Sequence, residues 1–137
     1  MLNVFLDTNV IIDFLSNREP FCADAAIIVS LGANKKIKLS ASSMSFATAS
    51  YILEKTNDNQ RVKTLIAEFC HYCKVCVVDA DCVDFATASE FNDFEDAMQF
   101  RCAQKAKSDI ILTRNIKDFS ASTIPVCEPR NFLDKIV

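Results

Sequence analysis

Histidine, glycine and long apolar runs are scarce in this chain, and each shortage excludes something. His71 is the only histidine among 137 residues and lies apart from the acidic motifs described below, so we expect no histidine general base. Gly32 is the only glycine, and we expect it at the C-cap of a helix over residues 22–31. No apolar run approaches the roughly 20 residues of a membrane span. The first residues enter a strand pattern directly, with no basic region and no cleavage site, so no secretion signal is expected either.

Positive charge is also in short supply. The formal net charge is −3 and the isoelectric point is near 5.1, whereas proteins that coat nucleic acid are usually basic. A nuclease is not excluded, because divalent cations neutralise a cluster of carboxylates locally. The seven cysteines are an odd number set within apolar runs, which indicates buried thiols in a reducing compartment and predicts a cytoplasmic location.

Strand and helix patterns alternate along the chain without a linker or a repeat, so we expect residues 1–137 to form a single domain. Short strands are predicted at residues 4–6, 37–39, 75–78, 110–112 and 125–127, with helices between them and a final turn at 129–133. The predicted fold class is α/β, a three-layer α/β/α sandwich whose four- to five-stranded sheet is mostly parallel.

Three aspartates stand at element boundaries: Asp7 after the first strand, Asp96 near a helix start, and Asp118 after the strand at 110–112. The carboxyl ends of strands are where open α/β sheets bind ligands. Each aspartate also has a structural interpretation, because acids cap helices and occupy turns. The functional interpretation gains weight if all three project onto one edge of the sheet, where they would repel one another unless cations lie between them. Such an oxygen-rich site suits Mg²⁺ or Mn²⁺.

Three motifs together resemble the PIN domain, above all the single-domain bacterial toxins of type II toxin–antitoxin pairs. The motifs are Leu6-Asp7-Thr8-Asn9, Phe94-Glu95-Asp96-Ala97 and Leu112-Thr113-Arg114-Asn115-Ile116-Lys117-Asp118-Phe119, and the third is the most specific. The resemblance implies an endoribonuclease dependent on Mg²⁺ or Mn²⁺, with Asp7, Asp96 and Asp118 as catalytic and metal-binding acids. It implies polar support from Asn9, Thr113 and Asn115. It also implies a cognate antitoxin protein as partner, and we expect a homodimer.

One position departs from the family's pattern. The family usually places a glutamate on the helix after the second strand, and the matching residue here is Thr48. Threonine can order a metal-bound water but supplies no charge. Glu95, beside Asp96, is the better candidate to restore that charge as a metal ligand.

Other signals have competing interpretations. Arg114 and Lys117 flank Asn115 and could hold RNA phosphates, or could be solvated loop cations. Cys70, Cys73 and Cys76, with His71 among them, have part of the spacing of an iron–sulfur or zinc site. The next cysteine, Cys82, comes only after the strand, so no fourth ligand follows at the expected distance.

The same holds for two smaller groups. Lys35, Lys36 and Lys38 favour a solubilised helix end over RNA binding. Phe91 and Phe94 could stack on bases, although a packed loop anchor is favoured.

The function predicted from the sequence is cleavage of single-stranded RNA by a metal-dependent endoribonuclease, as the toxin of a toxin–antitoxin pair. The main rival is a catalytically degenerate PIN-fold module that binds RNA or a protein partner without turnover. A phosphatase with Asp7 as nucleophile is a third interpretation, but Asn9 stands where a second aspartate is needed.

Overall fold

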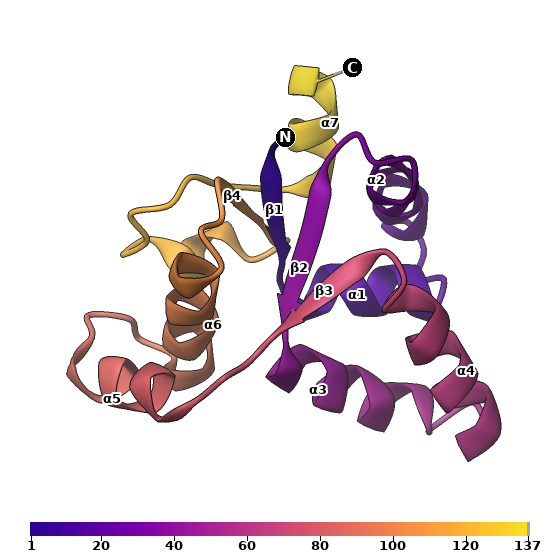
Figure 1. Cartoon of the computed structure of the whole chain (residues 1–137), viewed down its shortest axis with the longest axis horizontal. Coiled ribbons are helices and arrows are strands. Elements are labelled where there is room, and N and C mark those ends of the chain that lie inside the picture. The colour runs from indigo at the N-terminus through magenta and orange to yellow at the C-terminus, as the bar shows by residue number, and fades with distance from the viewer. Residues whose placement is uncertain (137) are drawn as a thin grey trace.

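A computed structural model describes residues 1–136 of the chain. Its five strands form one sheet in the order β3-β2-β1-β4-β5, and all four neighbouring pairs are parallel (Figure 1). The strands are β1 (Asn3–Leu6), β2 (Lys38–Ser42), β3 (Cys73–Cys76), β4 (Ile110–Leu112) and β5 (Val126–Cys127). The helices are α1 (Thr8–Leu15), α2 (Cys22–Ala33), α3 (Ser43–Leu53), α4 (Asn59–Phe69), α5 (Ala80–Ala88), α6 (Phe94–Lys105), α7 (Pro129–Ile136) and the 3₁₀ helix η1 (Ile116–Phe119).

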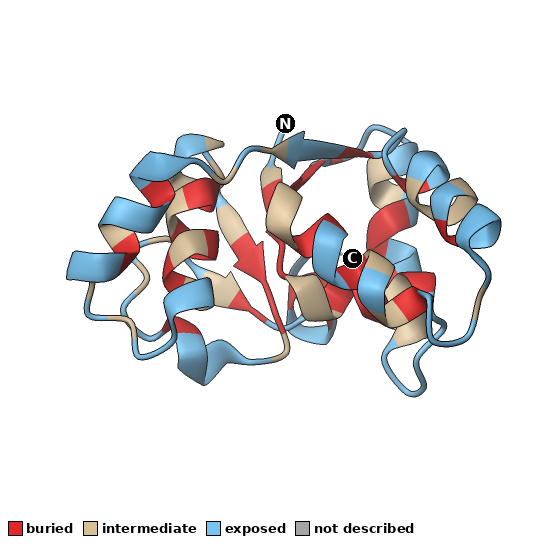
Figure 2. Cartoon of the chain, turned by 90° about the horizontal axis from the view of Figure 1, so that it is seen from below, coloured by how far each residue is buried: buried red, intermediate tan, exposed pale blue. Residues whose placement is uncertain are grey.

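The central strand β1 is buried on both faces, as is typical of a parallel sheet covered by helices. Val4 and Leu6 belong to the core formed with α1, α2, α3, α4 and α7. Phe5 points to the opposite face and joins a smaller core with residues of α5, α6 and η1. Figure 2 shows the buried residues on the strands and on the helix sides that face them. The predicted three-layer α/β/α class is confirmed.

Short polar side chains fix where several helices begin. Ser42 starts α3 by accepting from the backbone N–H of Ser45, and Asp58 starts α4 in the same way with Arg61. Asp93 caps α6 by accepting from the N–H of Asp96 at 3.0 Å. These caps satisfy backbone donors that have no partner within the helix. Because Asp93 provides the cap of α6, the carboxylate of Asp96 is not used for capping.

The prediction for Gly32 is wrong. Gly32 lies inside α2, and the helix ends at Asn34, followed by Lys35 with a positive φ of 59°. A Cβ on Gly32 would lie 2.5 Å from Cδ1 of Leu39 on β2. The glycine therefore permits close contact between α2 and the sheet. The left-handed conformation that often follows a helix end is taken by Lys35 instead of Gly32.

Further boundaries differ from the sequence prediction. The second strand covers Lys38–Ser42 instead of 37–39. The third strand covers Cys73–Cys76 instead of 75–78, and it is an edge strand on which Val75 is exposed. An edge strand pairs on one side only and is less buried than a central strand. The apolar run at 75–78 therefore does not coincide with the residues that pair with β2. The final segment is a helix, Pro129–Ile136, where a turn was predicted. Its buried Phe132 and Leu133 dock it on the larger core.

Candidate metal-dependent active site

The site begins at Asp7, which directly follows β1 and caps α1. Its side chain is 6 % exposed. Oδ2 accepts a hydrogen bond from the Thr113 hydroxyl at 2.7 Å, and Oδ1 accepts from the Thr8 N–H at 2.8 Å. Burial raises the pKa of Asp7, the hydrogen bonds from Thr113 and Thr8 oppose that rise, and nearby Asp118 adds to it. The carboxylate thus caps α1, and the hydrogen bonds that it accepts from Thr8 and Thr113 fix its orientation.

Asn9 and Thr113 connect Asp7 to the loop after β4. The Asn9 amide donates to Oδ2 of Asp7 at 3.4 Å and to the Thr113 hydroxyl at 3.2 Å. Its carbonyl oxygen accepts from the backbone N–H of Arg114 at 3.2 Å. The backbone N–H of Asn115 donates to the Thr113 hydroxyl at 3.0 Å. These bonds tie the first and third motifs together across the neighbouring strands β1 and β4.

Asp96 is the acid that the structure leaves free. Asp93 provides the cap of α6, and no hydrogen bond to the Asp96 carboxylate is formed within residues 1–136. Burial, followed by repulsion from Asp7, Asp93, Asp118 and Glu95, raises the pKa of Asp96 to about 7. Its side chain lines a cavity of about 230 Å³ together with Asp7 and Glu95. Asp96 is therefore not the cap of α6, although it lies in the first turn, where an acid also suits the helix dipole.

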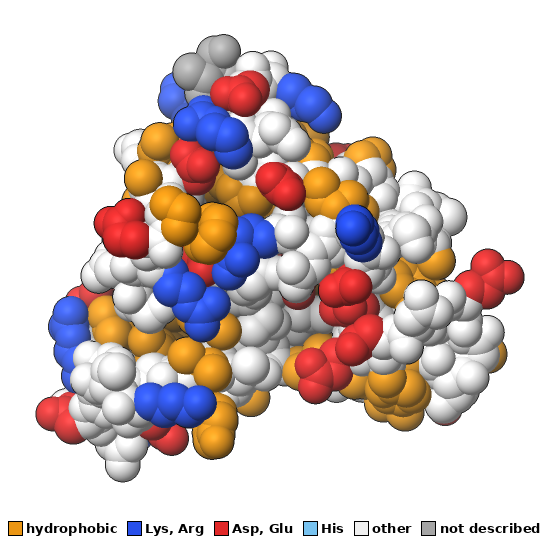
Figure 3. Space-filling view, turned by 180° about the vertical axis from the view of Figure 1, so that it is seen from behind, with side chains coloured by type: hydrophobic (Ala, Val, Ile, Leu, Met, Phe, Trp, Pro, Cys, Tyr) orange, Lys and Arg blue, Asp and Glu red, His pale blue; other side chains and the backbone are white. Residues whose placement is uncertain are grey.

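Asp118 lies on η1, in the loop that follows β4. It is exposed and does not line the 230 Å³ cavity, but it is close enough to raise the pKa of both Asp7 and Asp96. Lys117 beside it is exposed, and Asn115 lines the cavity. From the side opposite to Figure 1, acidic side chains gather beside a hollow in the lower half of the molecule (Figure 3).

Gln99 belongs to the site although the sequence analysis did not select it. The side chain is 2 % exposed, and its amide donates to Ser45 Oγ at 2.7 Å, Thr8 Oγ1 at 3.0 Å and Asp7 Oδ1 at 3.3 Å. Its carbonyl oxygen has no partner among the described residues. Gln99 follows Asp96 by three residues on α6, so both lie on the same helix face. That spacing is the signal that could have identified it.

Thr48 lines the same cavity, on α3, in the position that the sequence match gives it. It is exposed, and it lines the cavity together with Glu95 and Asp96 of α6. The missing glutamate therefore leaves the α3 side of the site without negative charge. Glu95 is exposed on the α6 side, next to Asp96.

Arg114 has a different environment from the one predicted. Its guanidinium donates twice to the carboxylate of Asp13, Nε to Oδ2 at 2.7 Å and Nη2 to Oδ1 at 3.1 Å. The guanidinium carbon also lies 3.9 Å from the centre of the Phe21 ring. Arg114 is thus not a solvated loop cation, because Asp13 engages two of its donors. Its contact with RNA phosphate stays a prediction.

The donor set fits a divalent cation in its chemistry, although it is not a closed cage. Within residues 1–136, no three His, Cys, Asp or Glu side chains lie close enough to hold a metal ion together as they stand. Mg²⁺ usually retains several waters and binds through one or two carboxylates and substrate phosphates, so an open arrangement suits it. Burial first, and repulsion from neighbouring acids second, raise the pKa of Asp96, and a cation would relieve that repulsion. Asp7 and Asp96 are the residues that would hold it, with Asp118 and Glu95 beside them.

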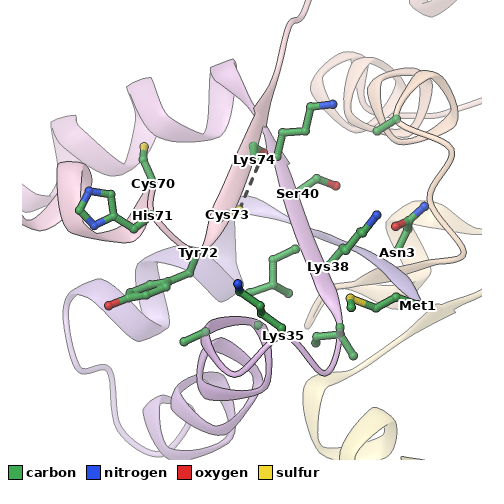
Figure 4. A pocket seen from close by; sticks show the side chains of 15 residues that line it. Met1, Asn3, Lys35, Lys38, Ser40, Cys70, His71, Tyr72, Cys73 and Lys74 are labelled. Carbon is green, nitrogen blue, oxygen red and sulfur yellow. Dashed lines mark hydrogen bonds between the residues drawn. The ribbon is translucent and has the colours of Figure 1, made fainter.

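Another cavity, of about 620 Å³, is lined by none of these acids (Figure 4). Lys35, Lys38 and Lys74 line it, and Lys74 is on the edge strand β3, where lysine commonly prevents unwanted strand pairing. Cys70, His71 and Cys73 also border it, but the thiol of Cys73 donates to the Lys74 carbonyl, and no metal-binding group is found there among the described residues.

Phe91 is a packed loop anchor: its ring lies against that of Phe100, with ring centres 5.2 Å apart.

The family model described as "PIN domain" matches residues 3–117. The chain therefore belongs to the PIN domain family, as the three motifs predicted. None of the curated proteins compared with the sequence matches it.

Solved structures with the same fold include several from toxin–antitoxin systems. A toxin–antitoxin complex from Klebsiella pneumoniae shares 22 % identity with a TM-score of 0.66, covering 92 % of this chain and 97 % of that one. VapBC-1 from nontypeable Haemophilus influenzae shares 14 % identity with a TM-score of 0.67, covering 94 % and 99 %. VapC20 of Mycobacterium tuberculosis, described as a toxin that cleaves the sarcin–ricin loop, shares 18 % identity with a TM-score of 0.66, covering 88 % and 95 %. At these identities the likeness establishes the fold.

In residues 1–136 no helix combines the length and the apolar character needed to span a membrane.

Proposed function

We propose that this protein is a metal-dependent endoribonuclease that cleaves single-stranded RNA, and that it is the toxin of a toxin–antitoxin pair. Membership of the PIN family supports a nuclease, and the structural neighbours from VapBC systems support a cognate antitoxin as partner. The observation that carries the proposal is that Asp7 and Asp96 line one cavity, with Asp118 near enough to raise the pKa of both. A homodimer and a cytoplasmic location belong to the same proposal.

Each side chain of the site has a distinct task. Asp7 and Asp96, with Asp118 and Glu95 near them, would hold Mg²⁺ or Mn²⁺, and such an ion would supply an activated water and stabilise charge on the phosphate. Thr113 and Asn9 orient Asp7 through their hydrogen bonds. Asn115 and Thr48 line the cavity, where they can order water. Lys117, exposed beside Asp118, is placed to contact the RNA backbone.

A second candidate function is binding without turnover, and one observation favours it. Thr48 replaces the usual acid, and the remaining carboxylates do not form a preassembled metal cage among the described residues. A site with weak metal affinity could still hold RNA or a protein partner. The two candidates differ only in whether the RNA backbone is broken.

The experiment is a cleavage assay on a short unstructured RNA with added Mn²⁺, with EDTA as the metal-free arm. Asp96→Asn is the cleanest matched control, because the Asp96 carboxylate accepts no hydrogen bond within residues 1–136 and the amide has the same shape. We expect cleavage that requires Mn²⁺ and disappears in Asp96→Asn. Cleavage that persists in Asp96→Asn would contradict the assignment of the site.

A further inference from the structure

Two arginines flank the buried carboxylate of Asp13, and they are not equivalent. Asp13 lies on α1 and is 1 % exposed. Arg114 makes two hydrogen bonds to it, and Nη1 of Arg18 lies 3.8 Å from its Oδ1, beyond hydrogen-bond distance. Arg114 therefore makes both hydrogen bonds to Asp13, and Arg18 adds only a longer ion pair to the same carboxylate.

Arg18 is directed to the acidic site, whereas Arg114 is not. Arg18 lines the 230 Å³ cavity that contains Asp7, Asp96 and Thr48. Arg114 lines a separate cavity of about 390 Å³ with Phe21 and Arg130. The side chain of Arg18 is 43 % exposed, against 24 % for Arg114. Within the described part of the chain, the Arg18 guanidinium donates no hydrogen bond. Its contact with Asp13 is an ion pair of 3.8 Å through Nη1, so hydrogen-bond donors remain for a ligand in the cavity.

The backbone holds Arg18 firmly at the rim. Its N–H donates to the carbonyl of Asp13 at 3.1 Å, and its own carbonyl accepts from Phe21 at 2.9 Å and Cys22 at 2.7 Å. Asn17 before it has a positive φ of 52°, which turns the chain back after α1. A fixed backbone reduces the entropy lost when the guanidinium engages a ligand.

We propose that Arg18 is the arginine that binds the RNA backbone at this site, through a phosphate next to the one that is cleaved. This inference rests on the proposed function. Crowded carboxylates repel an approaching polyanion, and a cation fixed on the rim offsets that repulsion. Guanidinium offers paired donors that match two phosphate oxygens, so a single arginine both attracts and orients the strand.

The test measures binding of a fluorescent unstructured RNA by anisotropy, in an Asp96→Asn background so that the RNA stays intact, with Mn²⁺ present. Arg18→Ala, Arg18→Lys and Arg130→Ala are compared. Arg130→Ala is the matched control, because it removes the same charge from a side chain that pairs with Asp24 and Asp134 away from the site. Thermal melting of each variant shows that it is folded.

We expect Arg18→Ala to weaken binding about tenfold at low salt and to reduce the slope of log K against log salt by about 0.7, the value for one single-strand phosphate contact. Arg18→Lys should recover the salt slope and only part of the affinity, because lysine keeps the charge without the paired donors. Arg130→Ala should leave both quantities unchanged.

Arg18→Ala binding that equals the parent, or a loss shared equally by Arg130→Ala, would overturn the inference while leaving the proposed function intact. If the parent protein binds no RNA with Mn²⁺ present, both fail. A folded Arg18→Ala variant that keeps its RNA affinity but loses affinity for an acidic protein partner would assign Arg18 to that partner instead, and would also overturn the inference.

Discussion

The buried carboxylate of Asp13 and the guanidinium of Arg114 form a two-bond ion pair that locks the loop after β4 onto α1, with Nε–Oδ2 at 2.7 Å and Nη2–Oδ1 at 3.1 Å. The same loop carries Thr113, which orients Asp7, and Asn115, which lines the acidic cavity. The ion pair does not line the acidic cavity, but it stabilises the loop that carries two of the residues of the site. Removing one partner of such a pair leaves a buried charge uncompensated.

Arg114→Ala should lower the free energy of unfolding by about 3 kcal/mol, the lower end for a buried pair, because Arg18 still lies 3.8 Å from the carboxylate of Asp13. Urea denaturation measures this. Arg130→Ala, at an exposed pair, should change it by less than about 1 kcal/mol. The double variant Asp13→Ala/Arg114→Ala should cost clearly less than the sum of the two single variants, by about 1–3 kcal/mol. Additive losses would show that the two side chains act independently.

Thr48→Glu should tighten Mn²⁺ binding. The substitution places a carboxylate on the α3 side of the cavity that Asp96 also lines. Calorimetric titration measures the affinity, with Thr48→Gln as a control of equal size and no charge. Tighter binding in Thr48→Glu alone would identify the missing charge as the limiting factor. Equal affinity in both variants would mean that Glu95 already fills the role or that the helix match is wrong.

Without metal, the protein should become less stable as the pH rises from about 4 to about 7. Burial and neighbouring acids raise the pKa of Asp96 from 3.8 to about 7, and burial also raises that of Asp7. The folded protein then binds more protons than the unfolded chain in this window, so the free energy of unfolding falls as these protons leave.

Melting temperatures in EDTA across this range check the pH prediction, and Asp96→Asn should remove much of the slope because the amide does not titrate. An unchanged slope in Asp96→Asn would exclude Asp96 as its source. Mn²⁺ should restore stability most strongly at the high end of the range, where the carboxylates are ionised.

Gln99→Leu should destabilise the protein by about 1–3 kcal/mol, since Thr8 and Ser45 lose a buried donor. It should also lower Mn²⁺ affinity, because the Gln99 amide is one of the groups that orient Asp7. Urea denaturation and calorimetry give the two values separately. A stability loss with unchanged Mn²⁺ affinity would restrict Gln99 to a structural role.

The fold could be predicted because its signals are local. Central strands such as β1 and β4 are short apolar runs, and the helices between them have capping residues at their starts. The boundaries that were wrong depend on contacts distant in sequence. Gly32 is needed inside α2 by the approach of Leu39, and β3 is defined by pairing with β2 at the sheet edge.

The sequence predicted that Asp7, at a strand end, and Asp96, near a helix start, lie at one edge of the sheet, and both line the same cavity. Their partners could not be placed in the same way. Arg114 is adjacent to Asn115 in the motif, but its side chain turns to Asp13, 101 residues away in the chain. Arg18 lies in a loop with no motif of its own and reaches the cavity only through the turn after α1. The two arginines differ in the direction of their side chains, and tertiary contacts set that direction.

The most direct test of the central claim follows one unstructured RNA over hours with the wild-type protein and Mn²⁺, while Mn²⁺ binding is measured on the same preparation. Both proposed functions predict that Mn²⁺ binds and raises the melting temperature, so only the fate of the RNA separates them. The endoribonuclease account predicts slow cleavage that EDTA abolishes and that Asp7→Asn and Asp96→Asn remove. Bound Mn²⁺ and bound RNA that remains whole would contradict it and establish a binding module.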